Sequence, residues 1–377
     1  MNFPQLSNDP GQQALFRLIQ QNIVQAGGWI GFDRFMALAL YAPGMGYYAN
    51  DLRKLGAMPD SGSDFVTAPE LSPWFGRTLA RQVAEALRET NTDEVWEFGA
   101  GSGALALQLL DTLGDRVRQY SIVDLSGSLR ARQIDTLKAH ADKVRWVDAL
   151  PDQMQGVVVG NEVLDAMPVQ LLVRKGGVWH ERGVVWQDAA DGPLQWQDRV
   201  TDLRPPVAVE GAHDYLTEIH SQAEAFVKTL ADRLLAGQRA GLQGGAIFMI
   251  DYGFAESEYY HPQRASGTVM CHQLHHADPD PLHDVGAKDI TAHVNFTSMA
   301  QAAHDAGLAV LGYTTQAHFL INCGLLQPLM DASLAEKAMA QKLITEHEMG
   351  ELFKVIALGT HAWEPLGFVQ GDRTHVL

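Results

Sequence analysis

A glycine-rich turn between two carboxylates is the part of this sequence best suited to hold a ligand. Residues 95–103 read Val-Trp-Glu-Phe-Gly-Ala-Gly-Ser-Gly, an apolar run that leads into a G-x-G-x-G turn and then a predicted helix. Glycines in such a turn permit positive φ and let a ligand approach the backbone at a helix N-terminus. Glu97 precedes the turn, and Asp124 ends the next predicted strand, near the spacing at which a carboxylate reaches ribose hydroxyls.

The glycine pattern alone leaves three interpretations open. Gly99, Gly101 and Ala104 also satisfy the looser dinucleotide fingerprint G-x-G-x-x-A, and the turn could equally be a connector that binds nothing. Two features favour a methyl donor: Gly103 extends the glycine run, and Glu97 places a carboxylate where a pyrophosphate would be repelled. S-adenosylmethionine carries an α-ammonium and a sulfonium and has no phosphate. We therefore expect this cofactor, with S-adenosylhomocysteine as the product, to contact Glu97, Gly99, Gly101, Gly103, Asp124, Asp148 and Asn161.

Strand and helix signals alternate around these residues, which indicates a mostly parallel sheet with helices on both faces. The predicted sheet strands are 95–98, 120–123, 144–147, 157–160, 246–250, 309–314 and 353–358. Amphipathic helices are predicted over 12–25, 32–40 and 74–88, with a surface loop over 52–73. Turn signals divide 169–196 into β-rich runs, which predicts an antiparallel insertion, and a helix is expected from about 215 to 235.

These elements predict an α/β fold with a doubly wound, mostly parallel seven-stranded sheet, preceded by a helical and loop extension and interrupted by a β-rich insertion. The expected domain limits are 1–90 for the extension, 91–168 with 241–365 for the cofactor-binding core, and 169–240 for the insertion.

Composition narrows the function classes. The 377 residues carry a formal net charge of -17, which argues against a nucleic-acid partner bound through its phosphates. The two cysteines, Cys271 and Cys323, are too few for a disulfide scaffold or a cysteine-type zinc site. No signal peptide, transit peptide or membrane-length apolar run is evident, so we expect a cytoplasmic protein without a membrane partner.

With those residues in hand, the chain resembles the MidA-like family, the mitochondrial complex I assembly-factor methyltransferases and their bacterial relatives. The generic match is the glycine turn. The more specific matches are Tyr41-Ala42-Pro43-Gly44-Met45-Gly46-Tyr47-Tyr48, Asp64-Phe65-Val66-Thr67-Ala68-Pro69-Glu70, Gly160-Asn161-Glu162-Val163-Leu164-Asp165-Ala166-Met167-Pro168-Val169, Ile250-Asp251-Tyr252-Gly253 and Asp289-Ile290-Thr291-Ala292-His293-Val294-Asn295-Phe296. The resemblance implies a class I methyltransferase fold that uses S-adenosylmethionine. The family's mitochondrial members are protein arginine methyltransferases that act on a quinone-proximal subunit of respiratory complex I.

Arginine as a substrate makes a specific demand on the site. Its guanidinium stays protonated in proteins, so the pocket must hold two cations side by side, which favours carboxylates. Glu162 and Asp165 follow the fourth predicted strand, at the sheet edge where α/β folds bind ligands. We expect Glu162 to clamp the guanidinium and Asp165 to assist. Alternatively, both are helix-starting acids that complement the helix dipole.

Four further residues are expected to contact substrate: Asp64, Glu70, Tyr252 and His293. The two loop acids could instead be solvated surface groups. The histidine-rich run 271–276, with His283 and His293, lacks H-E-x-x-H or any matched Cys/His spacing, so no metal is expected.

Two other functions remain open. One is methylation of a different substrate, such as a small amine or a glutamine side chain, although no Asn-Pro-Pro-Tyr follows the fourth strand. The other is an assembly factor that binds the donor without turnover. The sequence does not reveal the oligomeric state.

Overall fold

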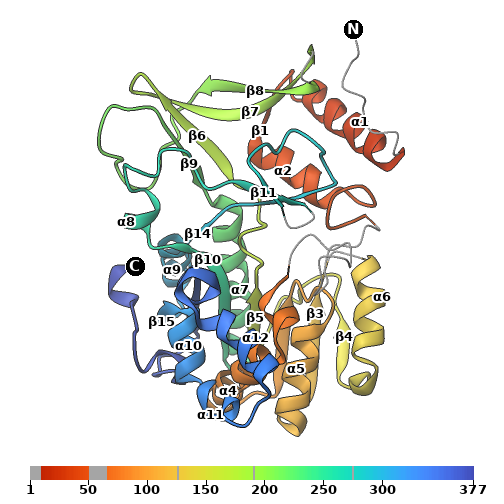
Figure 1. The fold of residues 1–377 in the computed structure, drawn as a ribbon, viewed down its shortest axis with the longest axis vertical. Helices are drawn as coiled ribbons and strands as arrows, with labels where there is room; N and C mark the ends of the chain where they lie inside the picture. Colours follow the sequence, from red (N-terminus) through yellow and green to blue (C-terminus); the bar gives the residue numbers. More distant parts are fainter. Residues whose placement is uncertain (1–9, 51–65, 125–126, 190–191, 274–275) are drawn as a thin grey trace. The chain divides into compact units, whose positions relative to one another are not determined.

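The computed structural model describes residues 10–50, 66–124, 127–189, 192–273 and 276–377, which form two compact units (Figure 1). The sheet unit comprises Val66–Asp165, Glu224–Ala255 and Val294–Leu377. The antiparallel unit comprises the described residues of Met1–Phe65, Ala166–Ala223 and Glu256–His293. These limits differ from the expected domain limits, because the helix at 73–89 packs with the sheet whereas 256–293 packs with the insertion.

The sheet unit is built on seven strands in the order β15-β16-β10-β5-β2-β3-β4, with a short strand, β14, added beside β10. Pairing is parallel from β4 through to β10, and only β16 runs antiparallel to its two neighbours. The predicted doubly wound, mostly parallel sheet is confirmed. The strands are β2 (Glu94–Phe98), β3 (Gln119–Val123), β4 (Val144–Trp146), β5 (Gly156–Asn161), β10 (Gly245–Phe254), β14 (Val294–Asn295), β15 (Ala309–Thr315) and β16 (Phe353–Gly359).

Helices cover both faces of this sheet. Alternate strand residues such as Val95, Val157 and Phe248 project from one face into a core shared with α4, α5, α10 and α12. From the opposite face Phe98 packs edge-on against Phe226 of α7, with ring centroids 5.0 Å apart. The helices are α3 (Ala68–Leu71), α4 (Pro73–Glu89), α5 (Ala104–Leu113), α6 (Gly127–Thr136), α7 (Ser221–Arg239), α9 (Phe296–Asp305), α10 (Gln316–Asn322), α11 (Leu326–Leu329) and α12 (Leu334–Ile344).

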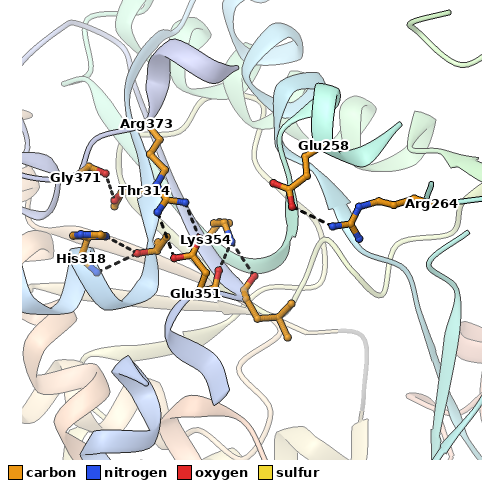
Figure 2. Close-up of polar contacts among 10 residues, drawn as sticks. Glu258, Arg264, Thr314, His318, Glu351, Lys354, Gly371 and Arg373 are labelled. Carbon is orange, nitrogen blue, oxygen red and sulfur yellow. Dashed lines mark hydrogen bonds and ion pairs between the residues drawn. The ribbon is translucent and has the colours of Figure 1, made fainter. Parts of the chain in front are cut away.

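Residues 371–373 are hydrogen-bonded to β15 and to the segment that precedes β16 (Figure 2). The guanidinium of Arg373 donates to Oε1 of Glu351 across 2.7 Å, and the hydroxyl of Thr314 donates to the carbonyl of Gly371 across 2.6 Å. The ammonium of Lys354 donates to the carbonyl of Glu351. The first two contacts hold residues 371–373 beside β15 and the segment that precedes β16.

The antiparallel unit contains the predicted β-rich insertion. Its larger sheet has the order β1-β7-β6-β9 with β8 beside β7, and its smaller sheet has the order β12-β11-β13. Trp186 packs edge-on against Phe16, and Trp196 packs against Phe32, so these tryptophans belong to the core of the unit. The elements are α1 (Pro10–Gln25), β1 (Ile30–Gly31), α2 (Phe32–Tyr41), β6 (Gln170–Lys175), β7 (Val178–Ala189), β8 (Gly192–Val200), β9 (Tyr215–Ile219), α8 (Glu256–Tyr259), β11 (Met270–Gln273), β12 (His276–Asp278) and β13 (Asp289–Thr291).

One predicted element is wrong in part. The helix expected from about 215 to 235 begins only at Ser221, and Tyr215–Ile219 is instead the strand β9, paired with β6. Tyr215 and Thr217 are buried on that strand, so pairing in the sheet outweighs any local helical preference. Among the described residues no helix combines the length and apolarity needed to cross a bilayer.

Candidate active site at the carboxyl edge of the sheet

The glycine turn follows β2 in the sheet unit and adopts the backbone that its sequence predicts. Gly99, Gly101 and Gly103 have φ values of 62°, 56° and 85°, a region that residues with a Cβ rarely occupy. Gly103 caps the N-terminus of α5. The turn therefore presents backbone to a ligand at the start of a helix, as expected.

Glu70 is brought to this turn by a short helix, α3, inside the predicted surface loop. The hydroxyl of Ser102 donates to Oε1 of Glu70. The amide of Gln108 on α5 donates to the carbonyl of Pro69 across 2.8 Å, which fastens α3 to the helix that follows the turn. Glu70 thus lies against the cofactor turn, and its predicted contact with substrate stays a prediction.

Asp124 is held by a residue that the sequence analysis missed. Nε2 of Gln133 on α6 donates to Oδ2 of Asp124 across 2.8 Å and to the carbonyl of Gly101 across 3.0 Å. Its Oε1 accepts from Nε1 of Trp146 on β4 across 2.9 Å. The only sequence signal was a glutamine on a weakly amphipathic helix, which does not reveal burial.

Glu97 is buried below the glycine turn, although we expected its carboxylate to face the ligand. The hydroxyl of Tyr120 donates to Oε2 of Glu97 across 2.7 Å, and Glu97 is 2% exposed. Burial raises the pKa of Glu97 to about 8; the bond from Tyr120 opposes this rise and the charge of Asp124 adds to it. Ionisation of Glu97 is therefore disfavoured near neutral pH, which weakens the expectation that it repels a pyrophosphate.

The segment after β5 carries the two acids expected to act in catalysis. Glu162 has a φ of 54°, a left-handed conformation that is strained for a residue with a side chain. Its N–H donates to the carbonyl of Ile250 across 2.9 Å. Oδ2 of Asp251 then accepts from the backbone N–H groups of Val163 (3.1 Å), Leu164 (2.8 Å) and Asp165 (3.3 Å). Asp251, a second residue that the sequence analysis did not assign to the site, thereby holds the strained turn in place.

Asp165 and Tyr252 meet at the same edge. The hydroxyl of Tyr252 donates to Oδ2 of Asp165 across 2.6 Å, and the Tyr252 ring packs edge-on against Phe353. Burial, followed by the negative charges of Asp165 and Glu162, raises the pKa of Asp251 well above its usual value. The ends of β5 and β10 therefore carry three carboxyl groups close enough to influence one another.

These residues fit a cationic, phosphate-free nucleoside. The side chain of Asn161 is 9% exposed, and its Oδ1 has no hydrogen-bond partner among the described residues. An unsatisfied buried acceptor costs about 1–3 kcal/mol, so a ligand N–H at this point would be favoured. A Cβ added at Gly99 would lie 3.1 Å from Cγ2 of Val163, which places the glycine turn against the segment that follows Asn161.

Two further predicted site residues have partners within their own units. Asp148 follows β4, is exposed and pairs with Arg130 across 3.2 Å. His293 belongs to the antiparallel unit, where its N–H donates to Oγ1 of Thr268. Asp64 lies outside the described residues. Within the described ranges, no group of three or more His, Cys, Asp and Glu side chains is arranged to hold a metal ion.

Solved structures share this fold along the whole chain. A Burkholderia thailandensis protein, described as a "likely methyl transferase" and bound to S-adenosyl-homocysteine, is 46% identical, with a TM-score of 0.92 and 100% of both chains covered. A native crystal structure of an uncharacterized protein from the same organism is 45% identical, with a TM-score of 0.86 and 100% of both chains covered. The bound product in the first structure, at this identity and coverage, confirms the predicted cofactor.

Curated relatives match at lower identity over most of their length. "Protein arginine methyltransferase NDUFAF7 homolog, mitochondrial" of Caenorhabditis elegans is 26% identical over 89% of this chain and 84% of its own. "Protein arginine methyltransferase NDUFAF7, mitochondrial" of Homo sapiens is 26% identical over 94% of this chain and 86% of its own. A family model described as "Putative S-adenosyl-L-methionine-dependent methyltransferase" matches residues 78–314, which is more than half of the chain. The sheet order, the glycine turn and these matches agree: the chain belongs to this family of S-adenosylmethionine-dependent methyltransferases.

Proposed function

We propose that this methyltransferase acts on arginine side chains of a protein substrate. The observation that carries the proposal is the group of acids at the carboxyl ends of β5 and β10: Glu162, Asp165 and Asp251, with the hydroxyl of Tyr252 bonded to Asp165. The relatives named protein arginine methyltransferase support the same substrate class. Glu162 and Asp165 are the residues proposed to act on the substrate.

The chemistry of a guanidinium explains why acids are needed. S-adenosylmethionine, when bound, supplies a methyl group on a sulfonium with a good leaving group. Carboxylates can bind a guanidinium through two parallel N–H···O bonds and so aim one nitrogen. Glu162 is partly exposed and suits this clamp, whereas Asp165 is buried and oriented by Tyr252. Methylation of a guanidinium nitrogen releases one proton, which a carboxylate of this group can accept.

Asp251 gives the proposed clamp a fixed position. Three backbone N–H groups converge on its Oδ2, and they belong to the residues immediately after Glu162. A carboxylate in a strained conformation keeps its direction only if its surroundings hold it. The backbone that carries Glu162 is therefore fixed, and Nδ2 of Asn161 donates to Oε1 of its side chain across 3.0 Å.

The family resemblance suggests the first target to test, a subunit of the respiratory complex I type. We propose that such a subunit is methylated in the cytoplasm before it is assembled into its complex.

Incubation of the purified protein with donor carrying a labelled methyl group, in a lysate of its own source, tests the proposal. We expect label on a protein, and methylarginine after hydrolysis of that protein. Label on a small amine or on glutamine would overturn the arginine assignment. Tight binding of S-adenosylhomocysteine without any labelled product would point to an assembly factor without turnover.

A further inference from the structure

A buried glutamine joins the three parts of the cofactor side of the sheet unit. Gln133 of α6 is fully buried, and its amide makes three hydrogen bonds. Nε2 donates to Oδ2 of Asp124 after β3 and to the carbonyl of Gly101 in the glycine turn. Oε1 accepts from the indole N–H of Trp146 on β4. One side chain thus connects the ends of β2, β3 and β4.

The bonding pattern fixes which way the amide faces. The indole N–H of Trp146 is donor-only, so it must meet the amide oxygen, and the amide NH₂ must then face Asp124 and Gly101. Both acceptors lie on the segments expected to contact the donor, a ribose-binding acid and the glycine turn.

The helix that carries Gln133 is packed closely against the turn. A Cβ added at Gly103 would lie 3.5 Å from Cα of Gln133 and 3.5 Å from Cβ of Thr136. The hydroxyl of Thr136 donates to the carbonyl of Ser102 across 2.9 Å. Gln133 and Thr136 are three residues apart and lie on one helix face, so they share the turn but differ in one respect. Gln133 donates to Asp124, whereas the bond of Thr136 goes to Ser102.

We infer that Gln133 is a positioning residue for the donor: it orients the carboxylate of Asp124 toward the ribose and couples that carboxylate to the glycine turn. The inference rests on the cofactor assignment and not on the substrate, because no residue of the acid group after β5 takes part. Removal of the NH₂ group should weaken contact with the ribose specifically, and leave other contacts to the donor in place.

Three variants test this by calorimetric titration with S-adenosylhomocysteine and with its 2′-deoxy analogue. Gln133→Leu should weaken binding of S-adenosylhomocysteine about ten- to hundredfold, the range for loss of a charge-assisted hydrogen bond. It should also reduce the penalty that the wild-type protein shows for the missing 2′-hydroxyl. The matched control Thr136→Val removes a bond to the same turn without touching Asp124, so the 2′-hydroxyl penalty should stay at the wild-type value.

Gln133→Glu adds a second measurement, the pH dependence of affinity for S-adenosylhomocysteine, which a purely structural role of Gln133 would not change. At pH 8 two carboxylates would face each other, so binding should be weaker than in Gln133→Leu. As the pH falls to about 5.5, one carboxyl becomes protonated and can donate to the other, so affinity should recover. The charge of Asp124 also acts on Glu97, so the wild-type protein titrated over the same pH range is the reference for every variant.

The outcomes are distinct. Loss of the 2′-hydroxyl penalty in Gln133→Leu, with recovery of Gln133→Glu at low pH, supports the inference. Wild-type affinity in Gln133→Leu, or an unchanged 2′-hydroxyl penalty, overturns it. Thermal unfolding of each variant without ligand shows whether the fold is kept. If Gln133→Leu fails to fold, the pH series on Gln133→Glu decides alone, and affinity that does not rise as the pH falls then rejects the inference.

Discussion

The hydroxyl of Tyr252 donates to Oδ2 of Asp165 across 2.6 Å, joining two residues that lie 87 positions apart in the chain. Tyr252 lies in β10 and Asp165 in the turn after β5, and these two strands pair in parallel. Both were predicted as site residues, but for different roles. Their bond makes the position of Asp165 depend on Tyr252.

Tyr252→Phe keeps the ring packed on Phe353 and removes only this bond. We expect methyl transfer to slow about tenfold while affinity for S-adenosylhomocysteine changes little, because the bond orients a substrate-side acid. Combined with Asp165→Asn in a double-mutant cycle, urea unfolding should give a coupling of about 1–2 kcal/mol. Additive effects of the two changes would show that the bond contributes nothing.

Replacements of Glu162 test its carboxylate and its strained backbone separately. Glu162→Gln should abolish methyl transfer and leave binding of S-adenosylhomocysteine nearly intact. Glu162→Gly should also be inactive, yet more stable than Glu162→Ala by about 1 kcal/mol, because glycine adopts a φ of 54° without strain. Full activity in Glu162→Gln would remove this carboxylate from the reaction. Equal denaturation midpoints for the glycine and alanine variants would contradict the strain.

Glu97 should make the protein less stable as the pH rises. Its pKa in the fold is about 8, above the ordinary 4.5, so the folded state retains a proton that the unfolded state has lost between these values. The stability from this group is present below pH 4.5 and is lost as the pH approaches 8, by up to roughly 5 kcal/mol.

The matched variant for this test is Glu97→Gln, whose amide oxygen can still accept from Tyr120 and which does not titrate. Unfolding free energies of both proteins, measured by urea at intervals from pH 5 to 8.5, should diverge, with the wild type falling relative to the variant. Parallel curves would show that Glu97 ionises normally.

His220 should impose the opposite dependence at acid pH. It is 2% exposed, and burial, with the charge of His293, lowers its pKa from 6.5 to about 3. A neutral histidine in the fold contributes stability above pH 6.5 that is lost as the pH falls toward 3. The free energy of unfolding of His220→Gln should therefore fall less between pH 6 and pH 4 than that of the wild type. The exposed His276 provides the control, since His276→Gln should follow the wild-type curve; identical curves for all three proteins would reject the prediction.

The seven main strands could be predicted because each is a short apolar run bounded by turn residues. Val157–Asn161 and Ala246–Ile250 are buried throughout their length, as strands covered on both faces must be. Tyr215–Ile219 could not be recognised, because the five residues precede a helix directly and their pairing with β6 depends on residues 40 or more positions away.

The parts of the site that use uncommon residue patterns could be predicted from the sequence, and the parts that use ordinary residues could not. Runs of glycine in a turn and acids at strand ends can be recognised in a sequence. Gln133 leaves none, because its burial is decided by Trp146, Asp124 and the turn meeting in space. Asp251 was visible as an acid after a strand, but its function as acceptor for three N–H groups follows only from the course of the backbone at 163–165.

The position of β16 has a consequence for synthesis of the protein on the ribosome. This strand, Phe353–Gly359, enters between β10 and β15, which emerge earlier. Until residue 359 has left the exit tunnel, β10 presents an unpaired edge rich in apolar side chains, and β15 has no neighbour in the sheet. The nascent chain therefore exposes this open edge until β16 has been translated, and a stop codon before residue 353 would leave the sheet permanently open.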